Sequence, residues 1–135
     1  MFRVYSDKAE SLTGGVTVEN DRLERCLLLD FYGELLTDKQ RECCELHFNE
    51  DLSHGEIAEQ LGISRQGVWD NVRRAESAMR DIENKTGLIR RFSRTRDRLE
   101  RVSEKLARLA EQSEGETRKM IESVKDEIDS MKLEV

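Results

Sequence analysis

Residues 53–82 read S-H-G-E-I-A-E-Q-L-G-I-S-R-Q-G-V-W-D-N-V-R-R-A-E-S-A-M-R-D-I and carry the strongest structural signal in the chain. They hold two helix starts. Ser53 is followed by Glu56 at the spacing of a capping box, and Ser64 follows the break at Gly62. A short helix, a tight glycine turn and a longer helix across it would bury the apolar residues Ile57, Ala58, Leu61, Ile63 and Val68. This is the helix-turn-helix plan, in which the second helix enters the major groove of DNA.

The absence of proline and the abundance of Glu, Arg, Leu and Lys favour long helices on both sides of this motif. A first helix is expected from about Asn20 to Leu36, with an apolar stripe of Leu23, Leu27, Phe31 and Leu35. Thr37 and Gln40 form a second capping-box pair, which opens a helix through Cys43, Cys44, Leu46 and Phe48. The helix opened by Ser64 keeps one apolar face until Asn84 or Gly87 ends it, with Val68, Val72, Ala75, Met79 and Ile82 spaced 4-3-4-3.

A further helix begins near Leu88 and carries two apolar stripes, one on each side of residues 113–115. The stripes are Leu99, Val102, Leu106 and Leu109, then Ile121, Val124, Ile128 and Met131. Residues 113–115 form a hinge, a stutter or a hairpin turn. A narrow stripe needs a partner, most simply a second copy of the chain. We therefore expect dimerisation through Leu99, Val102, Leu106, Leu109, Ile121, Val124 and Ile128.

The predicted fold is all-α: a helix-turn-helix bundle followed by a long, coiled-coil-like C-terminal helical arm. The predicted organisation is a flexible N-terminal leader at 1–19, the helix-turn-helix domain at 20–87 and the arm at 88–135. With 5% aromatic residues, the core must be built mainly from aliphatic side chains and methionine.

The chain is acidic as a whole, which counts against nucleic-acid binding, but its charge is uneven. Its 23 Lys and Arg and 29 Asp and Glu residues give a net charge of −6. Residues 37–84 carry 6 basic and 11 acidic side chains, whereas residues 85–101 carry 7 and 2. The basic block therefore follows the motif, and any DNA affinity should fall steeply as salt is added.

The exposed face of the helix after Ser64 supplies groups that suit a nucleic acid. Ser64 suits a phosphate oxygen, Arg65 and Gln66 suit guanine and adenine edges, and two further arginines suit backbone phosphates. The full set expected to bind nucleic acid is Ser64, Arg65, Gln66, Trp69, Asn71, Arg73, Arg74, Arg90, Arg91 and Arg94.

Other interpretations of these residues remain open. Asp70 and Glu76 lie on or near the same face and repel phosphate, so the motif could instead be a protein-binding or dimerising three-helix unit. The neighbours of Trp69 favour packing or an interface over base stacking. The run Arg90, Arg91, Arg94, Arg96, Arg98 and Arg101 fits a phosphate backbone and the solvated flank of a coiled coil equally well.

Cys43, Cys44 and His47, with His54 further on, invite a metal site. Adjacent cysteines on a helix point about 100° apart, and no second Cys/His pair completes the site, so a buried or half-buried helix face is favoured. No catalytic constellation is visible, and we expect neither an enzyme nor a cofactor or metal. Three cysteines, with no secretory or membrane-spanning stretch, predict a reduced, cytoplasmic protein without membrane contact.

From about Leu28 to Arg91 the chain resembles the YlxM family of small bacterial helix-turn-helix proteins. The matching residues are F-Y-G-E-L-L-T-D-K-Q from Phe31 and L-S-H-G-E-I-A-E-Q-L-G-I-S-R-Q-G-V-W-D-N-V-R-R-A-E from Leu52. More loosely, residues 37–80 are similar to region four of bacterial sigma factors, which reads promoter DNA. Beyond residue 92 the tail shows no obvious counterpart of the family pattern.

The resemblance implies an all-α domain of four or five helices that forms a homodimer. It also implies a regulatory link to the signal recognition particle pathway, because family members are usually encoded beside components of that particle. Two hypotheses follow. The first is a sigma-region-four-like regulator that binds a nucleic acid as a dimer, with DNA favoured over RNA. The second is a protein-interaction module that binds a signal recognition particle component or its RNA, with the helix-turn-helix as scaffold.

Overall fold

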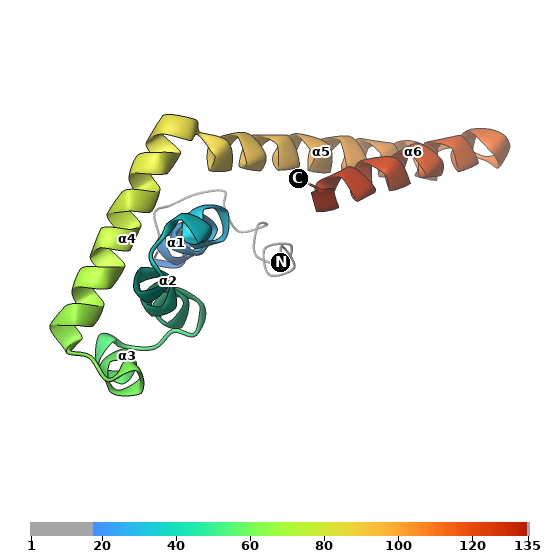
Figure 1. The fold of residues 1–135 in the computed structure, drawn as a ribbon. Coiled ribbons are helices and arrows are strands. Elements are labelled where there is room, and N and C mark those ends of the chain that lie inside the picture. Colours follow the sequence, from blue (N-terminus) through green and yellow to red (C-terminus); the bar gives the residue numbers. More distant parts are fainter. Residues whose placement is uncertain (1–17, 135) are drawn as a thin grey trace. The chain divides into compact units, whose positions relative to one another are not determined.

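The computed structural model describes residues 18–134, and within this range the chain is helical without a strand. In chain order the elements are α1 (Val18–Tyr32), the 3₁₀ turn η2 (Gly33–Leu35), α2 (Asp38–Cys44), the π-helical segment η3 (Glu45–Asn49), α3 (His54–Leu61), α4 (Arg65–Thr86), α5 (Leu88–Glu111) and α6 (Gly115–Glu134) (Figure 1). The all-α prediction is confirmed. Most of the leader predicted at 1–19 lies outside the described residues.

The chain divides after Ile89 into two compact units, the first ending there and the second beginning at Arg90. Among the described residues, no helix is both long enough and apolar enough to cross a membrane.

α1 ends at Tyr32, four residues before the expected end at Leu36, and it buries a different stripe from the predicted one. Its core residues are Leu28, Leu29 and Tyr32, whereas Leu35 lies in η2 and is 69% exposed. An every-fourth-residue stripe drifts by about 40° per step around a helix, so its ends cannot face the same neighbour. The predicted stripe is therefore wrong at Leu35, while Leu23, Leu27 and Phe31 are half-buried.

The predicted capping boxes form as expected. Thr37 accepts a hydrogen bond from the backbone N–H of Gln40, whose side chain accepts one from the Thr37 N–H. α2 then continues into η3 and contributes Cys43, Cys44, Leu46 and Phe48 to the core. Both cysteine side chains are completely buried although they point to different sides of the helix, because α2 is covered from more than one side.

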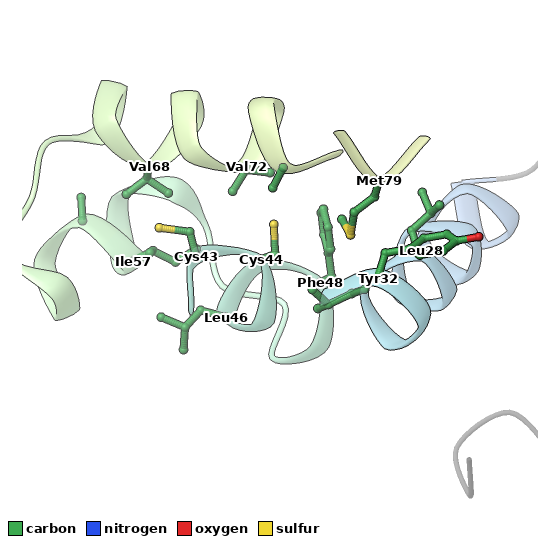
Figure 2. Close-up of a cluster of buried hydrophobic side chains, with 13 residues drawn as sticks. Leu28, Tyr32, Cys43, Cys44, Leu46, Phe48, Ile57, Val68, Val72 and Met79 are labelled. Atoms are coloured by element: carbon green, nitrogen blue, oxygen red, sulfur yellow. The ribbon is translucent and has the colours of Figure 1, made fainter. Parts of the chain in front are cut away.

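The core of the first unit lies under α4, as Figure 2 shows. Val68, Val72, Ala75 and Met79 follow one face of α4 and are buried, which confirms the predicted 4-3-4 spacing. They pack against a shared set of side chains from α1, α2, η3 and α3: Leu28, Leu29, Tyr32, Cys43, Cys44, Leu46, Phe48, Ile57 and Ala58. Burying a side chain of this kind stabilises the fold by about 1.5–3 kcal/mol, so this face firmly fixes the rotation of α4.

In the second unit, α5 and α6 run antiparallel as a helical hairpin (Figure 1). The turn at residues 112–114 leads into Gly115, whose φ of +62° favours glycine. Ser103 Oγ donates to Asp129 Oδ1 at 2.7 Å, and Lys132 Nζ lies 3.0 Å from Glu100 Oε2. Of the three possibilities for residues 113–115, the structure shows the hairpin turn.

The seam of the hairpin is more polar than the apolar stripes suggested. Arg96, Leu99, Ser103, Leu106 and Ala110 of α5, together with Ile121, Lys125, Ile128 and Lys132 of α6, recur at 3-4 spacing and are buried or half-buried. Asp129 accepts hydrogen bonds from Lys125, Ser103 and Lys132, which hold the pKa of its carboxyl well below the usual range. These paired polar groups favour one register of α5 on α6.

Candidate nucleic-acid interface

Local capping fixes the start of α4 and the turn before it. Ser53 and Glu56 complete the capping box of α3, and Gly62 ends that helix with a φ of +67°. Ser64 then caps α4, since its hydroxyl accepts the backbone N–H of Gly67 at 3.0 Å. This short connection fixes where α3 ends and α4 begins, as the helix-turn-helix plan requires.

The side chains on the outer face of this part of α4 are open to solvent. Ser64, Arg65, Gln66, Trp69, Arg73 and Arg74 are all exposed. The guanidinium of Arg73 lies 5.0 Å from the centre of the Trp69 ring, and Trp69 is 40% exposed. A cation over an aromatic face is held in place while its N–H groups stay available. The first three turns of α4 therefore present three arginines, a glutamine and an indole together.

Asn71 is the exception among the residues predicted on this helix. Its side-chain nitrogen donates to the carbonyl of Gly67 at 2.8 Å, and the residue is half-buried. Such a bond to the preceding turn occupies one of the two amide donors and turns the side chain back along the helix. Asn71 thus lies at the edge of the exposed surface instead of on it.

A hollow beside Arg65 was not anticipated from the sequence. Ser53, His54, Gly55, Arg65, Gln66 and Trp69 line it, so it joins the start of α3 to the start of α4. A Cβ added at Gly55 would lie 2.7 Å from Arg65 Nη2, and glycine therefore leaves the room that this guanidinium occupies. The only available signal in the sequence was the glycine inside a helical pattern.

His54 contributes a neutral ring to the wall of this hollow. Its ring centre lies 4.7 Å from that of His47, and its Nε2 has no hydrogen-bond partner among the described residues. Burial, followed by the neighbouring His47, lowers the pKa of His54. The His47 Nδ1 pairs with the Leu52 carbonyl at 2.8 Å.

The cysteines near His47 do not take part in a polar site. Burial is the main factor that raises the pKa of the Cys44 thiol to about 12, so it stays protonated at neutral pH. The described residues contain no group of three or more His, Cys, Asp and Glu side chains that could hold a metal ion.

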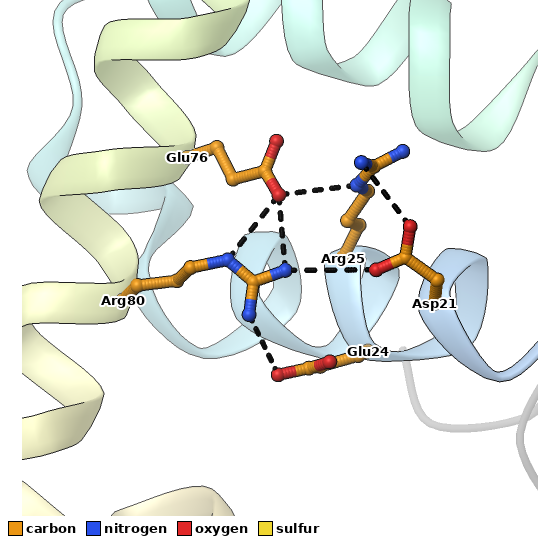
Figure 3. Close-up of polar contacts among 5 residues, drawn as sticks. All are labelled: Asp21, Glu24, Arg25, Glu76 and Arg80. Carbon is orange, nitrogen blue, oxygen red and sulfur yellow. Dashed lines mark hydrogen bonds and ion pairs between the residues drawn. The ribbon is translucent and has the colours of Figure 1, made fainter. Parts of the chain in front are cut away.

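Glu76 and Asp70 were expected to repel phosphate at this surface. The structure places them in different surroundings. Glu76 points to α1, where its Oε1 lies 3.1 Å from Arg25 Nε and 3.0 Å from Arg80 Nη2 (Figure 3). Arg80 also reaches Glu24 of α1 at 2.8 Å. Glu76 therefore shares Arg25 and Arg80 with Asp21 and Glu24 of α1 in one cluster of ion pairs. The expectation that Glu76 faces the nucleic acid is wrong, because its carboxylate is turned to α1. Its partner Arg25 lies 51 residues away in the sequence, so no local pattern indicates this contact.

Asp70 stays on the exposed side of α4, where Gln66 Nε2 donates to its Oδ1 at 3.3 Å. The first three turns of α4 contain one acidic residue, and it is Asp70. Its bond with Gln66 orients that amide and leaves one local negative charge on the surface.

Arg90, Arg91 and Arg94 lie at the start of α5 and are exposed. They belong to the second unit, whereas the residues from Ser64 to Arg74 belong to the first. The structure thus brings the α4 residues together and holds the three arginines on a separate element.

The two capped helices, their glycine turn and the exposed face of α4 are the features of a helix-turn-helix unit. A sequence profile of the family described as "UPF0122: Putative helix-turn-helix protein, YlxM / p13 like" matches residues 19–130. The chain belongs to this family. The match extends far past residue 92, so the view that the tail has no counterpart in the family is wrong.

Individual relatives cover the chain to different extents. The chain is 42% identical over 117 residues to a UPF0122 protein of Thermoanaerobacter sp. (strain X514), which spans 86% of this chain and 100% of the relative. It is 47% identical over 87 residues to a UPF0122 protein of Caldanaerobacter subterraneus subsp. tengcongensis, spanning 64% and 74%. A UPF0122 protein of Acetivibrio thermocellus is 51% identical over 75 residues, spanning 56% and 64%.

Proposed function

We propose that this protein is a non-enzymatic regulator that binds duplex DNA through the first three turns of α4. The observation that carries the proposal is the division of α4 into two parts. Its C-terminal part is tied to α1 by Glu76, Arg80 and Glu83, whereas the outer face of its N-terminal part is open. A helix presented in this way suits insertion into a major groove.

The roles of the side chains follow from their donors. Arg65 carries the paired N–H donors that guanine accepts, and Gln66 can both donate to and accept from adenine. Arg73 and Arg74, about two turns further on, suit backbone phosphates, as does the hydroxyl of Ser64 at the helix start. Trp69 supports Arg73 and supplies an apolar contact.

The test compares variants on a duplex selected from a random library, using fluorescence anisotropy at several salt concentrations. Arg65→Ala should lose about 1–3 kcal/mol of discrimination at one base position. Arg73→Ala with Arg74→Ala should weaken binding to all sequences and reduce the salt slope by about 1.8. Arg22→Ala, an exposed arginine of α1 paired with Asp51, is the control. If the wild-type protein fails to bind any duplex at low salt, the proposal is refuted.

We also propose that the α5–α6 hairpin binds a second copy of itself. Leu99, Leu106, Ile121 and Ile128 are half-buried in the hairpin, so the first partner of each predicted stripe is the other helix of the same chain. The remaining stripe residues are still open: Val102 is 42%, Leu109 50%, Val124 47% and Met131 47% exposed.

These exposed residues share one side of the hairpin. In each helix they are offset in the same rotational sense from the seam residues, by roughly 100°. Because the two helices run antiparallel, equal offsets project to the same side of the pair. Two hairpins packed through these sides would form a four-helix bundle with an apolar interior.

The size of this face suits a dimer. The helices overlap over about 30 Å at 1.5 Å per residue and are each about 10 Å wide, which gives roughly 600 Å² per copy. The total of roughly 1,200 Å² is at the lower end for stable interfaces. Val102→Glu with Val124→Glu should halve the mass measured by light scattering, whereas Ser123→Glu with Ser130→Glu, on the outer face of α6, should leave it unchanged. A wild-type monomer would contradict the dimer.

A second candidate function is a protein-interaction module that binds a signal recognition particle component or its RNA. The net charge of −6 favours it, because most of the surface repels a polyanion. Pull-down with those components, compared with binding to a random duplex library, separates the two candidates. For either function we propose a cytoplasmic location, since the three cysteines form no disulfide with one another.

A further inference from the structure

We infer that the face of α5 turned away from α6 is a second DNA-binding surface, which contacts the phosphate backbone without reading sequence. Its residues are Arg91, Arg94, Arg98, Arg101, Lys105 and Arg108, here called the basic stripe. The inference rests on the proposed DNA-binding function and adds a site that the helix-turn-helix does not include.

The basic stripe is continuous. Its residues recur at 3-4-3-4-3 spacing, which keeps them within an arc of roughly 100° on one face of the helix. Each of the six is exposed. The 17 residue steps from Arg91 to Arg108 make the stripe about 26 Å long. A duplex carries one negative charge per about 1.7 Å of its axis, so a stripe of this length meets many phosphates.

The basic stripe lies on the side of α5 opposite the seam with α6. Ser103 and Ala110 are buried against α6, and the stripe is centred roughly 180° from them around α5. The half-buried Arg96, by contrast, turns toward the seam and is not part of the stripe. The hairpin therefore leaves this face uncovered along its length.

Acidic side chains are kept off this face. The four acidic residues of α5 lie together on one flank of the helix and comprise Asp97, Glu100, Glu104 and Glu111. Arg94, Arg98, Arg101, Lys105 and Arg108 form no ion pair with any carboxylate of residues 20–134. A merely solvated helix face would not require this separation, since mixed charges stabilise exposed helices.

The outer face of α6 provides the contrast within the same hairpin. This face mixes acidic, neutral and apolar residues with one cation, Lys119, which pairs with Glu116 at 3.6 Å; its other residues are Met120, Ser123, Glu127, Ser130 and Glu134. The outer faces of α5 and α6 are thus both exposed but differ in charge. In a chain with a net charge of −6, a row of six cations points to a polyanionic partner.

Salt titration of the full-length protein with duplex DNA tests the stripe. Arg94→Gln, Arg98→Gln and Arg101→Gln together should reduce the slope of log K against log salt by about 2.7, or 0.9 per lost phosphate contact. If binding at 1 M salt is unchanged, the same relation gives up to about 500-fold weaker binding at 0.1 M salt. Replacing the three residues by Lys should keep the slope. Circular dichroism checks that the helix content is unaltered.

The control removes the same charge elsewhere: Lys39→Gln, Arg118→Gln and Lys119→Gln, all exposed. Equal effects of the control and stripe variants would overturn the inference, as would an unaltered slope in the stripe variant. A stripe variant that loses binding to duplex RNA but not to DNA would overturn the choice of DNA.

The two sites can fail separately. If Arg65→Ala leaves sequence preference intact while the stripe variant loses slope, the proposed role of α4 fails and the stripe stands. If Arg65→Ala removes preference while the stripe variant matches the control, the stripe fails and the role of α4 stands.

Discussion

Removing the hydroxyl of Tyr32 should loosen the attachment of α1 to the C-terminal part of α4. This hydroxyl donates to Glu83 Oε2 at 2.5 Å and lies 2.8 Å from Thr86 Oγ1, and Tyr32 is 2% exposed. Tyr32→Phe keeps the ring and its packing. A hydrogen bond to a charged group contributes about 1.5–3 kcal/mol. Because Glu83 Oε2 also accepts the Ile89 N–H at 3.1 Å, we expect a loss of about 2 kcal/mol in the free energy of unfolding.

Trp69 makes this loss measurable in the first unit alone. It is the single tryptophan of the chain, so its fluorescence during urea unfolding follows residues 18–89, whereas circular dichroism follows both units. The urea midpoint should fall while the slope m stays constant, since the surface exposed on unfolding is the same.

A double-mutant cycle of Tyr32→Phe with Glu83→Gln isolates the pair. We expect a coupling energy of about 1–2 kcal/mol, because the two groups are in direct contact. A destabilisation of less than about 0.5 kcal/mol for Tyr32→Phe, or additive effects of the two changes, would refute this attachment of α1 to α4.

Four further predictions concern the core, the hairpin and pH. Met79→Ala should lower the stability of the first unit by about 2–5 kcal/mol in urea unfolding followed by Trp69; a loss below 1 kcal/mol would mean that the site is not packed as described. Asp129→Asn should lower the thermal midpoint of the hairpin. In the wild-type protein the stabilising effect of Asp129 should be complete above its ordinary pKa of 3.8 and decline below it, because the folded-state pKa is lower; a hairpin that melts at the same temperature at pH 3 and pH 6 contradicts this. The first unit should lose stability as pH falls below 6.5, since the pKa of His54 is lowered by folding, and His54→Gln should remove that dependence. Deleting residues 99–135 should give a smaller oligomer by light scattering with Trp69 still in a folded unit, and an unchanged mass would indicate another interface.

Much of the first unit could be predicted because its signals are local. The capping boxes at Thr37 and Ser53, the stop at Gly62 and the start at Ser64 each depend on residues within one helical turn. The apolar face of α4 was equally clear, since a long helix shows its period many times. α1 was predicted less well, because its buried face is chosen by its neighbours and not by its own spacing.

The residues of the candidate surface could be predicted from the sequence, but the contacts around them could not. Arg65, Gln66 and Arg73 follow from the position of the helix start. The hollow beside Gly55 depends on how α3 and α4 meet, and the ion pair of Glu76 depends on Arg25 in another helix. Contacts between residues so distant in sequence leave no local pattern.

The partner of the C-terminal arm could not be predicted from the sequence either. Its apolar stripes indicated helices that need partners, but a stripe does not say whether the partner is the same chain or another copy. The polar residues Ser103, Lys125 and Asp129, which join α5 to α6, are indistinguishable in the sequence from solvated ones.

The central claim is that the open face at the start of α4 binds duplex DNA, and amide chemical-shift mapping at low ionic strength tests it most directly. On titration with a selected duplex, we expect the largest shifts at residues 64–74 and weaker, salt-sensitive shifts along 91–108. Shifts that leave residues 64–74 unmoved, or that are absent altogether, would contradict the account.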